Sequence, residues 1–554
     1  MKTEQLPQQL VRVDDAVLLP AAREILRLFF GRVRSIAPGL LAVGTGAEPE
    51  LISAGAVVGP PMAVSGPLHR GQRAVLWRFY LHDGRPRAQV ADLPASVEAV
   101  GRGGAEPSPV GANTGAGAVS NLPGAADVFL SGAAAALPAD VLLRRLAKIV
   151  FYRFCCRQTG RSYPWGSLTG IRPTYVAAEL LAAVKGDGDR ARAILQSTYD
   201  VAPAKASLAI RVARAEKALL QRLPNRACCL YIGIPFCPSK CHYCSFTLNE
   251  GIACSTAAKT LYIEALIKEL ELVLPRLKQP VAAVYIGGGT PGDLNADQIS
   301  LLLAALHRLL PALKRESVEI CFEAGRADAV TEDKLQTLLA AGVNRLCINP
   351  QTMHDRTLQL IGRKHSVAAV IQAFKLARSV GFSSINMDLI AGLPGETPAD
   401  FAATLSQLAA LEPDSLTVHT LAVKRSSDLN HRLKSGESGA FFDFKKPDPA
   451  VAEMLEAAVA YADKQGLLPY YLYRQKDGIG GLENIGFARL GAANLYNVAM
   501  MSDRCSILAF GCGGISKLVD RKGKATRSPN VKSLAAYLDR YEEMARRKID
   551  LFKM

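Results

Sequence analysis

The feature that most limits the fold of this 554-residue chain is a regular alternation of strand-like and helix-like segments in its middle part. Apolar runs rich in β-branched residues predict strands, and the longer amphipathic runs between them predict helices. Six strands are expected, at Cys228–Ile234, Ala282–Ile286, Ser317–Glu323, Arg345–Ile348, Ser384–Ile390 and Ser415–Leu421. Six βα repeats in roughly 200 residues predict an α/β fold, a parallel sheet with outer helices, either as an open partial barrel or as a doubly wound sheet.

Helical periodicity and end signals support this alternation. Ile263, Leu266 and Leu270 recur on one helical face, and Pro275 ends that run. Further helices are expected at Gln298–Leu310, Glu332–Ala341, Val367–Val380 and Ala399–Leu411. Glycine follows two of these segments directly, where a left-handed residue commonly ends a helix. If the sheet forms a barrel, chemistry is expected at the carboxyl ends of its strands.

The two flanking regions differ in character from the middle. Residues 1–224 are interpreted as an N-terminal accessory region with an insertion rich in Gly, Ala and Pro at about 101–140. Residues 225–440 hold the βα repeats. Residues 441–554 are expected to be helical, then rich in glycine, then helical again.

Composition narrows the classes of function. The net charge is +16, but the basic residues are scattered without interleaved aromatic residues. This favours a solvated basic surface, or a substrate with several carboxylates, and no nucleic acid is expected. No apolar stretch of membrane-spanning length and no targeting signal is found, which predicts a cytoplasmic protein without membrane contact. Twelve cysteines are too few for a disulfide scaffold of this length.

Three of those cysteines are clustered in one loop after the first expected strand. Cys237, Cys241 and Cys244 have the spacing Cys-x₃-Cys-x₂-Cys. Thiolates are the ligands that iron–sulfur clusters require, and three ligands leave one iron open to a small molecule. Structural zinc is the alternative, but it usually takes four ligands at other spacings. The spacing therefore predicts a [4Fe–4S] cluster.

A glycine run closes the second expected strand, in the segment Gly287–Pro291. Glycine allows a close approach of the backbone to a ligand, and Thr290 adds a hydroxyl group. By itself such a run is often only a tight turn. Next to the cysteine loop it is interpreted as one wall of a binding site.

These motifs together resemble the radical S-adenosylmethionine (SAM) superfamily. More narrowly, the segments YIGIPFC, GGGTP, FEAGR, NPQTMHDRTLQLIGRKH and NMDLIAGLPGE resemble the oxygen-independent coproporphyrinogen III oxidase-like family. PWGSLTGIRPT, LTVHTLAVKR and PYYLYRQK are similar to its HemZ-type branch, called coproporphyrinogen dehydrogenase. The resemblance begins near Pro164 and implies a partial (β/α)6 barrel with an additional N-terminal region and a mainly helical C-terminal region.

The resemblance also implies cofactors and their contacts. Cys237, Cys241 and Cys244 would hold the [4Fe–4S] cluster, which would bind SAM. The implied SAM contacts are Tyr243 at the adenine, Tyr231 near the cluster-bound SAM, Gly288, Gly289 and Thr290 at the methionyl part, Glu323 at the ribose, and Ala422 in the same pocket. A second SAM site in the oxidases draws on positions that match Gln351, Arg363 and Asp388.

The implied reaction is the oxidative decarboxylation of coproporphyrinogen III, a tetrapyrrole, to protoporphyrinogen IX in haem biosynthesis. A reduced flavodoxin or a ferredoxin-type protein would be the electron donor. Two positions depart from the oxidases: Phe246 stands where they have a fourth cysteine, and Gly233 where they usually have histidine. The first departure is shared with haem chaperones. A haem-binding protein that keeps the cluster, or a radical SAM enzyme for another tetrapyrrole, is therefore the alternative.

Simpler interpretations exist for several of these residues. Glu323 could be a hydrogen-bonded strand-end carboxylate, and Arg363 with Asp388 could form an ion pair at the barrel rim. Tyr470, Tyr471 and Tyr473 are expected to serve packing. Two sets of candidate ligands remain: Cys512 as a further cluster ligand, and His242, His354, His365 and His419 as axial ligands of haem.

Overall fold

The computed structural model describes residues 9–13, 18–30, 32–37, 40–44, 75–82, 85–92, 139–169, 172–244, 255–314, 318–423, 427–429, 448–475, 478–520 and 523–554. Phe246 and most of the predicted insertion lie outside these ranges. The chain divides into two compact units. One comprises Met1–Ile210 with Phe444–Pro447, and the other comprises Arg211–Asp443 with Asp448–Met554. None of the described helices is long and apolar enough to cross a membrane.

The first unit contains a five-stranded sheet in the order β2-β3-β1-β4-β5. Its strands are β1 (Gln9–Val13), β2 (Arg32–Ala37), β3 (Leu40–Gly44), β4 (Val75–His82) and β5 (Arg85–Asp92). Its helices are α1 (Leu19–Phe30), α3 (Ala139–Thr159), α4 (Pro173–Ala183) and α5 (Gly188–Tyr199), and α6 (Pro203–Gln221) continues into the second unit. Apolar residues of α1 and α3, such as Ile25 and Phe151, are fully buried against each other. The sequence analysis did not predict this sheet.

The second unit is built on an eleven-stranded sheet in the order β12-β13-β11-β10-β9-β8-β7-β6-β14-β15-β16. Its central strands are β6 (Cys228–Ile234), β7 (Val281–Gly288), β8 (Glu319–Gly325), β9 (Arg345–Ile348), β10 (Ile385–Ala391) and β11 (Ser415–Thr420). From β6 to β11, neighbouring strands of this set pair in parallel in the order of the chain. A doubly wound sheet would reverse its strand order at a switch point, so the order found here is that of a partial barrel. The predicted six βα repeats are thereby confirmed.

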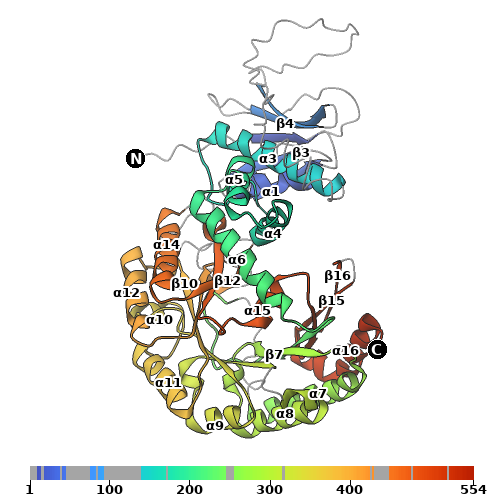
Figure 1. Ribbon diagram of the computed structural model, residues 1–554, viewed down its shortest axis with the longest axis vertical. Helices are drawn as coiled ribbons and strands as arrows, with labels where there is room; N and C mark the ends of the chain where they lie inside the picture. Colours follow the sequence, from blue (N-terminus) through green and yellow to red (C-terminus); the bar gives the residue numbers. More distant parts are fainter. Residues whose placement is uncertain are drawn as a thin grey trace, which may run out of the picture. The chain divides into compact units, whose positions relative to one another are not determined.

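The helices that alternate with these strands form an arc outside the sheet (Figure 1). They are α7 (Thr256–Val273), α8 (Ala296–Leu309), α9 (Glu332–Ala340), α10 (Asp355–Leu360), α11 (Val367–Val380) and α12 (Pro398–Ala409). Local signals fix their ends. Asn295 and Thr397 begin α8 and α12 with capping boxes, and Gly381 ends α11 in the left-handed conformation.

The C-terminal region contributes strands as well as helices. It contains α14 (Pro449–Lys464), β12 (Leu468–Arg474), β13 (Glu483–Ala488), α15 (Leu495–Met501), β14 (Ser506–Phe510), β15 (Ile515–Val519), β16 (Ala525–Pro529) and α16 (Leu534–Phe552). β13 adds to β11 in antiparallel orientation, and β14 adds to β6 in parallel. The region therefore extends the sheet at both edges, which the sequence analysis, with its helices and glycine-rich segment, did not predict.

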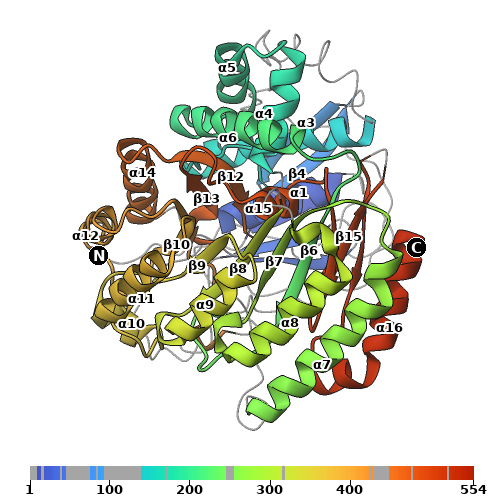
Figure 2. The ribbon, with the colours of Figure 1, turned by 60° about the horizontal axis from the view of Figure 1, so that its bottom comes forward.

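The C-terminal helix α16 lies beside α7 (Figures 1 and 2), and a buried ion pair joins them. The Lys548 Nζ lies 2.6 Å from the Glu269 Oε1, and both side chains are almost completely buried. Glu269 also accepts hydrogen bonds from the Tyr537 hydroxyl at 2.6 Å and from the Gly511 N–H at 2.9 Å. Because Gly511 follows β14, which pairs with β6, this network ties α16 to the edge of the sheet beside β6.

Short 3₁₀ turns complete the second unit. They are η4 (Leu274–Arg276), η5 (Pro291–Asp293), η6 (Pro311–Lys314), η7 (Ala327–Ala329) and η8 (Ile479–Gly481). η5 follows β7 and η7 follows β8, so both lie at the edge of the sheet where the parallel strands end. The cysteine loop, residues 235–244, follows β6 at the same edge.

Candidate active site at the carboxyl ends of the parallel strands

The cysteine loop places its three thiols in a partly buried position. The Cys237 Sγ lies 3.0 Å from the Thr290 Oγ1, and Cys241 is buried. Burial raises the pKa of the Cys237 thiol to about 12, against an opposing hydrogen bond with Thr290. None of the three takes part in a disulfide. Such a thiol ionises readily only when a metal replaces its proton.

The donor set fits an iron–sulfur cluster. Within the described ranges, no three His, Cys, Asp or Glu side chains are close enough together to hold one metal ion. A cubane cluster holds its ligands further apart than a single ion does, because each thiolate binds a different iron. Three thiols on one short loop, none of them in a disulfide, are therefore suited to a cluster rather than to a mononuclear site.

The cysteine loop is fixed by a segment that begins at the end of α10. The His242 N–H donates to the carbonyl of Ile361 at 3.0 Å, and the His242 Nδ1 lies 3.0 Å from the carbonyl of Leu360. A second segment also holds the loop, since the Leu429 N–H donates to the carbonyl of His242 at 2.8 Å. Backbone contacts thus define the path of the loop without any ligand.

The glycine run packs against β6 and the start of the cysteine loop. A Cβ atom on Gly288, whose φ is +120°, would lie 2.9 Å from the carbonyl oxygen of Ile234. A Cβ atom on Gly289 would lie 2.4 Å from the carbonyl oxygen of Phe236. The Thr290 N–H donates to that same carbonyl at 2.7 Å. The fold itself therefore requires glycine at these positions, whatever ligand the site takes.

Glu323, near the carboxyl end of β8, lies under the glycine run. Its carboxylate accepts hydrogen bonds from the Tyr285 hydroxyl and from the Gly288 N–H, the latter at 3.2 Å. Burial, together with a smaller effect of the nearby Asp388, raises the pKa of Glu323 to about 7, whereas the bond from Tyr285 opposes the rise. A carboxylate held in this way can accept hydrogen bonds from ligand hydroxyl groups when it is ionised. It is a hydrogen-bonded strand-end carboxylate, as the simpler interpretation also expected.

Three tyrosine rings continue this wall toward the interior of the sheet. Tyr231 stacks on Tyr285 with ring centroids 6.4 Å apart and on Tyr496 at 6.0 Å. Burial raises the pKa of Tyr231 above its ordinary value, so its hydroxyl remains protonated. The Tyr231 hydroxyl lies near the position that a Cβ atom on Gly288 would occupy. Sequence reasoning selected Tyr231 but not Tyr285 or Tyr496.

Buried polar atoms without partners mark the other side of the site. Gln351 has a φ of +70°, and its backbone N–H donates to the carbonyl of Asp388 at 2.8 Å. Among the described residues, the Gln351 Oε1 and the Arg363 Nε are buried without a hydrogen-bond partner. Buried polar atoms are normally satisfied, so these two are available to hydrogen-bond a ligand at this edge of the sheet.

Arg363 and Asp388 do not pair with each other. Arg363 donates from Nη1 to the carbonyl of Asn349 at 2.5 Å and from Nη2 to the Tyr243 hydroxyl at 3.3 Å. Asp388 accepts from Asn386 at 2.7 Å and lies 3.7 Å from the Nε2 of His419. The ion pair considered as the simpler interpretation is therefore wrong. Arg363 instead joins the tyrosine of the cysteine loop to the strand-end segment after β9.

The end of β11 completes the arc of site residues. Ala422 forms an isolated antiparallel bridge with Gly478. The Nδ1 of His419 lies 3.2 Å from the hydroxyl of Tyr473, so Tyr473 contacts a polar partner in addition to packing. Tyr470 and Tyr471 are buried, in agreement with the packing interpretation.

The remaining candidate ligands have protein partners. The Cys512 Sγ donates to the carbonyl of Lys532 at 2.8 Å. The His354 Nε2 lies 2.8 Å from the carbonyl of Asp400, and His365 is buried beside Asp328. Nothing in these contacts tests Cys512 as a cluster ligand or the histidines as haem ligands.

Sequence reasoning missed Arg326, the residue directly after β8. Its side chain is 2% exposed and donates from Nη1 to the Ser239 Oγ at 2.5 Å, inside the cysteine loop. The only signal was its position in the segment FEAGR, three residues after Glu323. The partner in the loop could not be inferred from that position.

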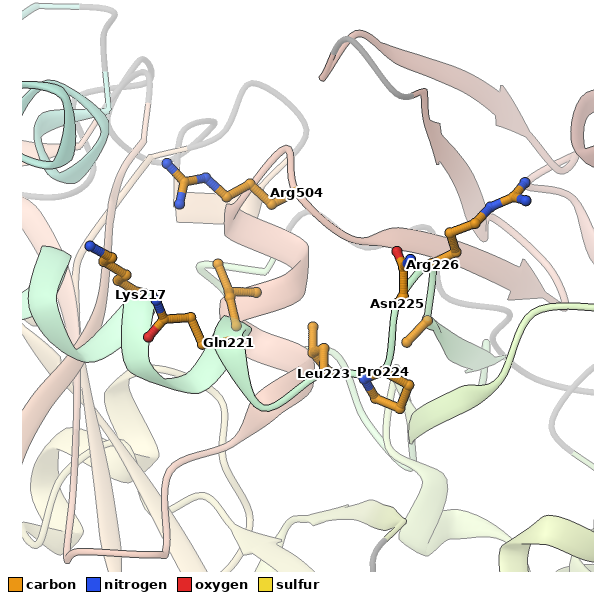
Figure 3. A pocket seen from close by; sticks show the side chains of 9 residues that line it. Lys217, Gln221, Leu223, Pro224, Asn225, Arg226 and Arg504 are labelled. Carbon is orange, nitrogen blue, oxygen red and sulfur yellow. The ribbon is translucent and has the colours of Figure 1, made fainter. Parts of the chain in front are cut away.

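A separate hollow of about 340 Å³ lies at the opposite edge of the sheet (Figure 3). It is lined by the end of α6 and the approach to β6, including Lys217, Gln221 and Arg226, together with Arg504. None of the site residues named above lines it. The candidate active site is therefore defined by the strand ends and not by this hollow.

Comparisons with known proteins agree with the motifs. Residues 231–408 match the model of the Radical SAM superfamily. The chain is 37% identical to the oxygen-independent coproporphyrinogen-III oxidase-like protein HemZ of Bacillus subtilis. The alignment spans 411 residues and covers 72% of this chain and 79% of HemZ. It is 30% identical to the heme chaperone HemW of the same organism, in an alignment that covers 56% of this chain and 74% of HemW. The solved coproporphyrinogen III oxidase HemN of Escherichia coli matches 60% of this chain and 73% of its own, with 26% identity and a TM-score of 0.46.

Proposed function

The chain belongs to the radical SAM superfamily, within the family of oxygen-independent coproporphyrinogen III oxidase-like proteins, and on that premise we propose that it oxidatively decarboxylates coproporphyrinogen III to protoporphyrinogen IX. The superfamily as a whole uses a [4Fe–4S] cluster and SAM. The names of two relatives support the substrate. The HemZ-like protein is named for coproporphyrinogen, and so is the oxidase of Escherichia coli, to which this chain is 35% identical over 211 residues. The charge of +16 suits a substrate with four carboxylates.

One observation carries the proposal. The thiols of Cys237, Cys241 and Cys244, the Glu323 carboxylate and the unpartnered Gln351 Oε1 and Arg363 Nε gather at one edge of a parallel sheet. That edge is where enzymes of this architecture place their chemistry. Cys237, Cys241 and Cys244 would hold the cluster, which when bound supplies the electron that cleaves SAM.

The other site residues would bind SAM and hold the cysteine loop in place. Glu323 would accept hydrogen bonds from the ribose hydroxyls of SAM, and Tyr243, held by Arg363, would lie against its adenine. The glycine run and Thr290 keep the cysteine loop against β7. For each vinyl group formed, one hydrogen atom and one CO₂ leave a propionate side chain, and the electron released balances the electron that cleaves SAM.

The first test is the cluster itself. Anaerobically reconstituted protein should hold about four iron and four sulfide per chain, and Cys241→Ala should lose most of both. Cys155→Ala, which changes a buried thiol of the first unit, is the matched control and should keep them. A Cys241→Ala variant with a complete cluster that still responds to SAM would refute the assignment of the ligands.

The second test identifies the substrate. Protein, SAM and a reduced flavodoxin are incubated anaerobically with coproporphyrinogen III, and porphyrins and 5′-deoxyadenosine are measured. We expect protoporphyrinogen IX, with SAM cleavage faster when the substrate is present. The chain's 30% identity to HemW, a heme chaperone, favours haem binding as the second candidate. Stoichiometric haem binding with no substrate-dependent SAM cleavage would replace the first proposal with the second.

A further inference from the structure

Arg326 connects the end of β8 to the middle of the cysteine loop. Its guanidinium donates from Nε to the Asp328 Oδ1 at 2.9 Å and from Nη2 to the Asp328 Oδ2 at 2.7 Å. These two parallel bonds fix the plane of the guanidinium group. The third nitrogen, Nη1, then points at Ser239, which lies between Cys237 and Cys241.

The charges around Arg326 are arranged so that it stays paired and buried. Although partial burial opposes it, the nearby His365 and the two hydrogen bonds from Arg326 lower the pKa of Asp328, so its carboxylate remains ionised. The guanidinium charge therefore lies against the cysteine loop at Ser239 as well as beside Asp328.

We propose that Arg326 is a positioning residue that holds the cysteine loop through Ser239 and places a fixed positive charge beside the cluster. This inference rests on the proposed cluster. Three thiolates give the bound cluster a net negative charge, which increases on reduction, and a nearby cation in a buried site stabilises the more negative state. Arg326 thus sets both how tightly the cluster is held and how easily it is reduced.

Two variants separate the two effects. Ser239→Ala removes the contact with the loop and leaves the charge, whereas Arg326→Gln removes both. Arg326→Lys keeps a positive charge but cannot donate two parallel bonds and a third one. The matched control is Arg308→Gln, which removes an exposed arginine that pairs with Glu271 on the outer helices.

The measurements are the rate at which an iron chelator removes the cluster and the midpoint potential of the cluster, followed by electron paramagnetic resonance. Arg326→Gln should lose iron about tenfold faster or more, in line with other residues that orient metal ligands, and its midpoint potential should become more negative. Ser239→Ala should lose iron faster with an unchanged midpoint potential. Arg326→Lys should lose iron faster while its midpoint potential stays near that of the wild type. Arg308→Gln should match the wild type in both.

The outcomes are distinguishable. Arg326→Gln with the chelation rate and midpoint potential of the wild type overturns the role of Arg326 alone. If Arg326→Gln does not accumulate as folded protein, Ser239→Ala and Arg326→Lys decide. A wild-type chelation rate in Ser239→Ala overturns the proposal that Arg326 holds the loop. A midpoint potential in Arg326→Lys that is clearly more negative than that of the wild type overturns the electrostatic role, because this variant keeps the positive charge. Wild-type protein that takes up no iron overturns the proposed cluster itself.

Discussion

The affinity for SAM should depend on the protonation state of Glu323. Burial, with a smaller contribution from the neighbouring Asp388, raises the pKa of this carboxyl group to about 7, and the hydrogen bond from Tyr285 opposes that rise. The ribose hydroxyls are donors, so they need the ionised carboxylate as their acceptor. SAM should therefore bind more tightly as the pH rises through 7.

The magnitude follows from the pKa. With a pKa of about 7, roughly a tenth of the protein has ionised Glu323 at pH 6 and roughly nine tenths at pH 8. If only the ionised form binds, the dissociation constant should fall about tenfold between these pH values, which corresponds to about 1.4 kcal/mol. Glu323→Gln should bind more weakly than the wild type at pH 8, and its dissociation constant should not change with pH.

The same carboxyl group should cost the free protein stability above neutral pH. Its pKa is higher in the folded than in the unfolded state, so between pH 4.5 and 7 the folded protein binds more protons and stability falls as the pH rises. A rise from 4.5 to about 7 corresponds to about 3 kcal/mol, which partial exposure of the side chain reduces to about 2 kcal/mol. In Glu323→Gln this cost disappears, but glutamine accepts one hydrogen bond fewer, which is worth about 1 kcal/mol. The variant should therefore melt a degree or two above the wild type at pH 8.

Equilibrium dialysis of SAM at pH 6, 7 and 8, with anaerobically reconstituted protein, measures the affinity, and thermal melting of the free protein measures the stability. Two controls are needed. Glu271→Gln changes an exposed carboxylate on α7 and should behave as the wild type. His419 lies near Glu323, so a His419→Gln variant must keep the pH dependence if Glu323 is its source. A wild-type affinity that does not change between pH 6 and 8, or an equal change in Glu323→Gln, would refute the reasoning.

Two further perturbations test how the site is supported. Gly288→Ala should destabilise the second unit by at least about 2 kcal/mol and speed iron loss, because its Cβ atom would meet the backbone of Ile234 at a positive φ. Gly491→Ala is the matched control, since Gly491 also has a positive φ but no atom near its Cβ position, and equal losses of melting temperature in the two variants would contradict the clash. Lys548→Met should cost about 3–5 kcal/mol, because it leaves the Glu269 carboxylate buried without a cation. Adding Glu269→Gln to Lys548→Met should recover part of that loss. Resistance to proteolysis measures the stability, and a Lys548→Met variant as resistant as the wild type would contradict the expectation.

Much of the second unit was predictable from the sequence because the signals are local. The strands expected at Cys228–Ile234 and Arg345–Ile348, and the helix expected at Val367–Val380, coincide with β6, β9 and α11. Periodicity, caps and glycine stops act over a few residues, and they are read directly from the chain. The spacing of the three cysteines is equally local, so the donor set could be chosen before the fold was known.

The C-terminal strands could not be predicted in the same way. β14 and β13 are short, and each is stabilised by pairing with a strand that is distant in sequence. β14 pairs with β6, and β13 pairs with β11. Glycine-rich sequence around Gly486 and Gly511 indicates turns unless those pairings are known. The periodicity of such short segments does not show which strand will accept them.

By itself the sequence determined the six βα repeats, the cysteine spacing and the candidate residues at the strand ends. Only the tertiary structure decided which of these residues meet. It separates Arg363 from Asp388, and it brings Arg326 to Ser239 across 87 positions of the chain. The physical reason is that parallel strands bring their carboxyl ends to one edge whatever lies between them in sequence, whereas the partner of each side chain depends on the path of the loops and on burial.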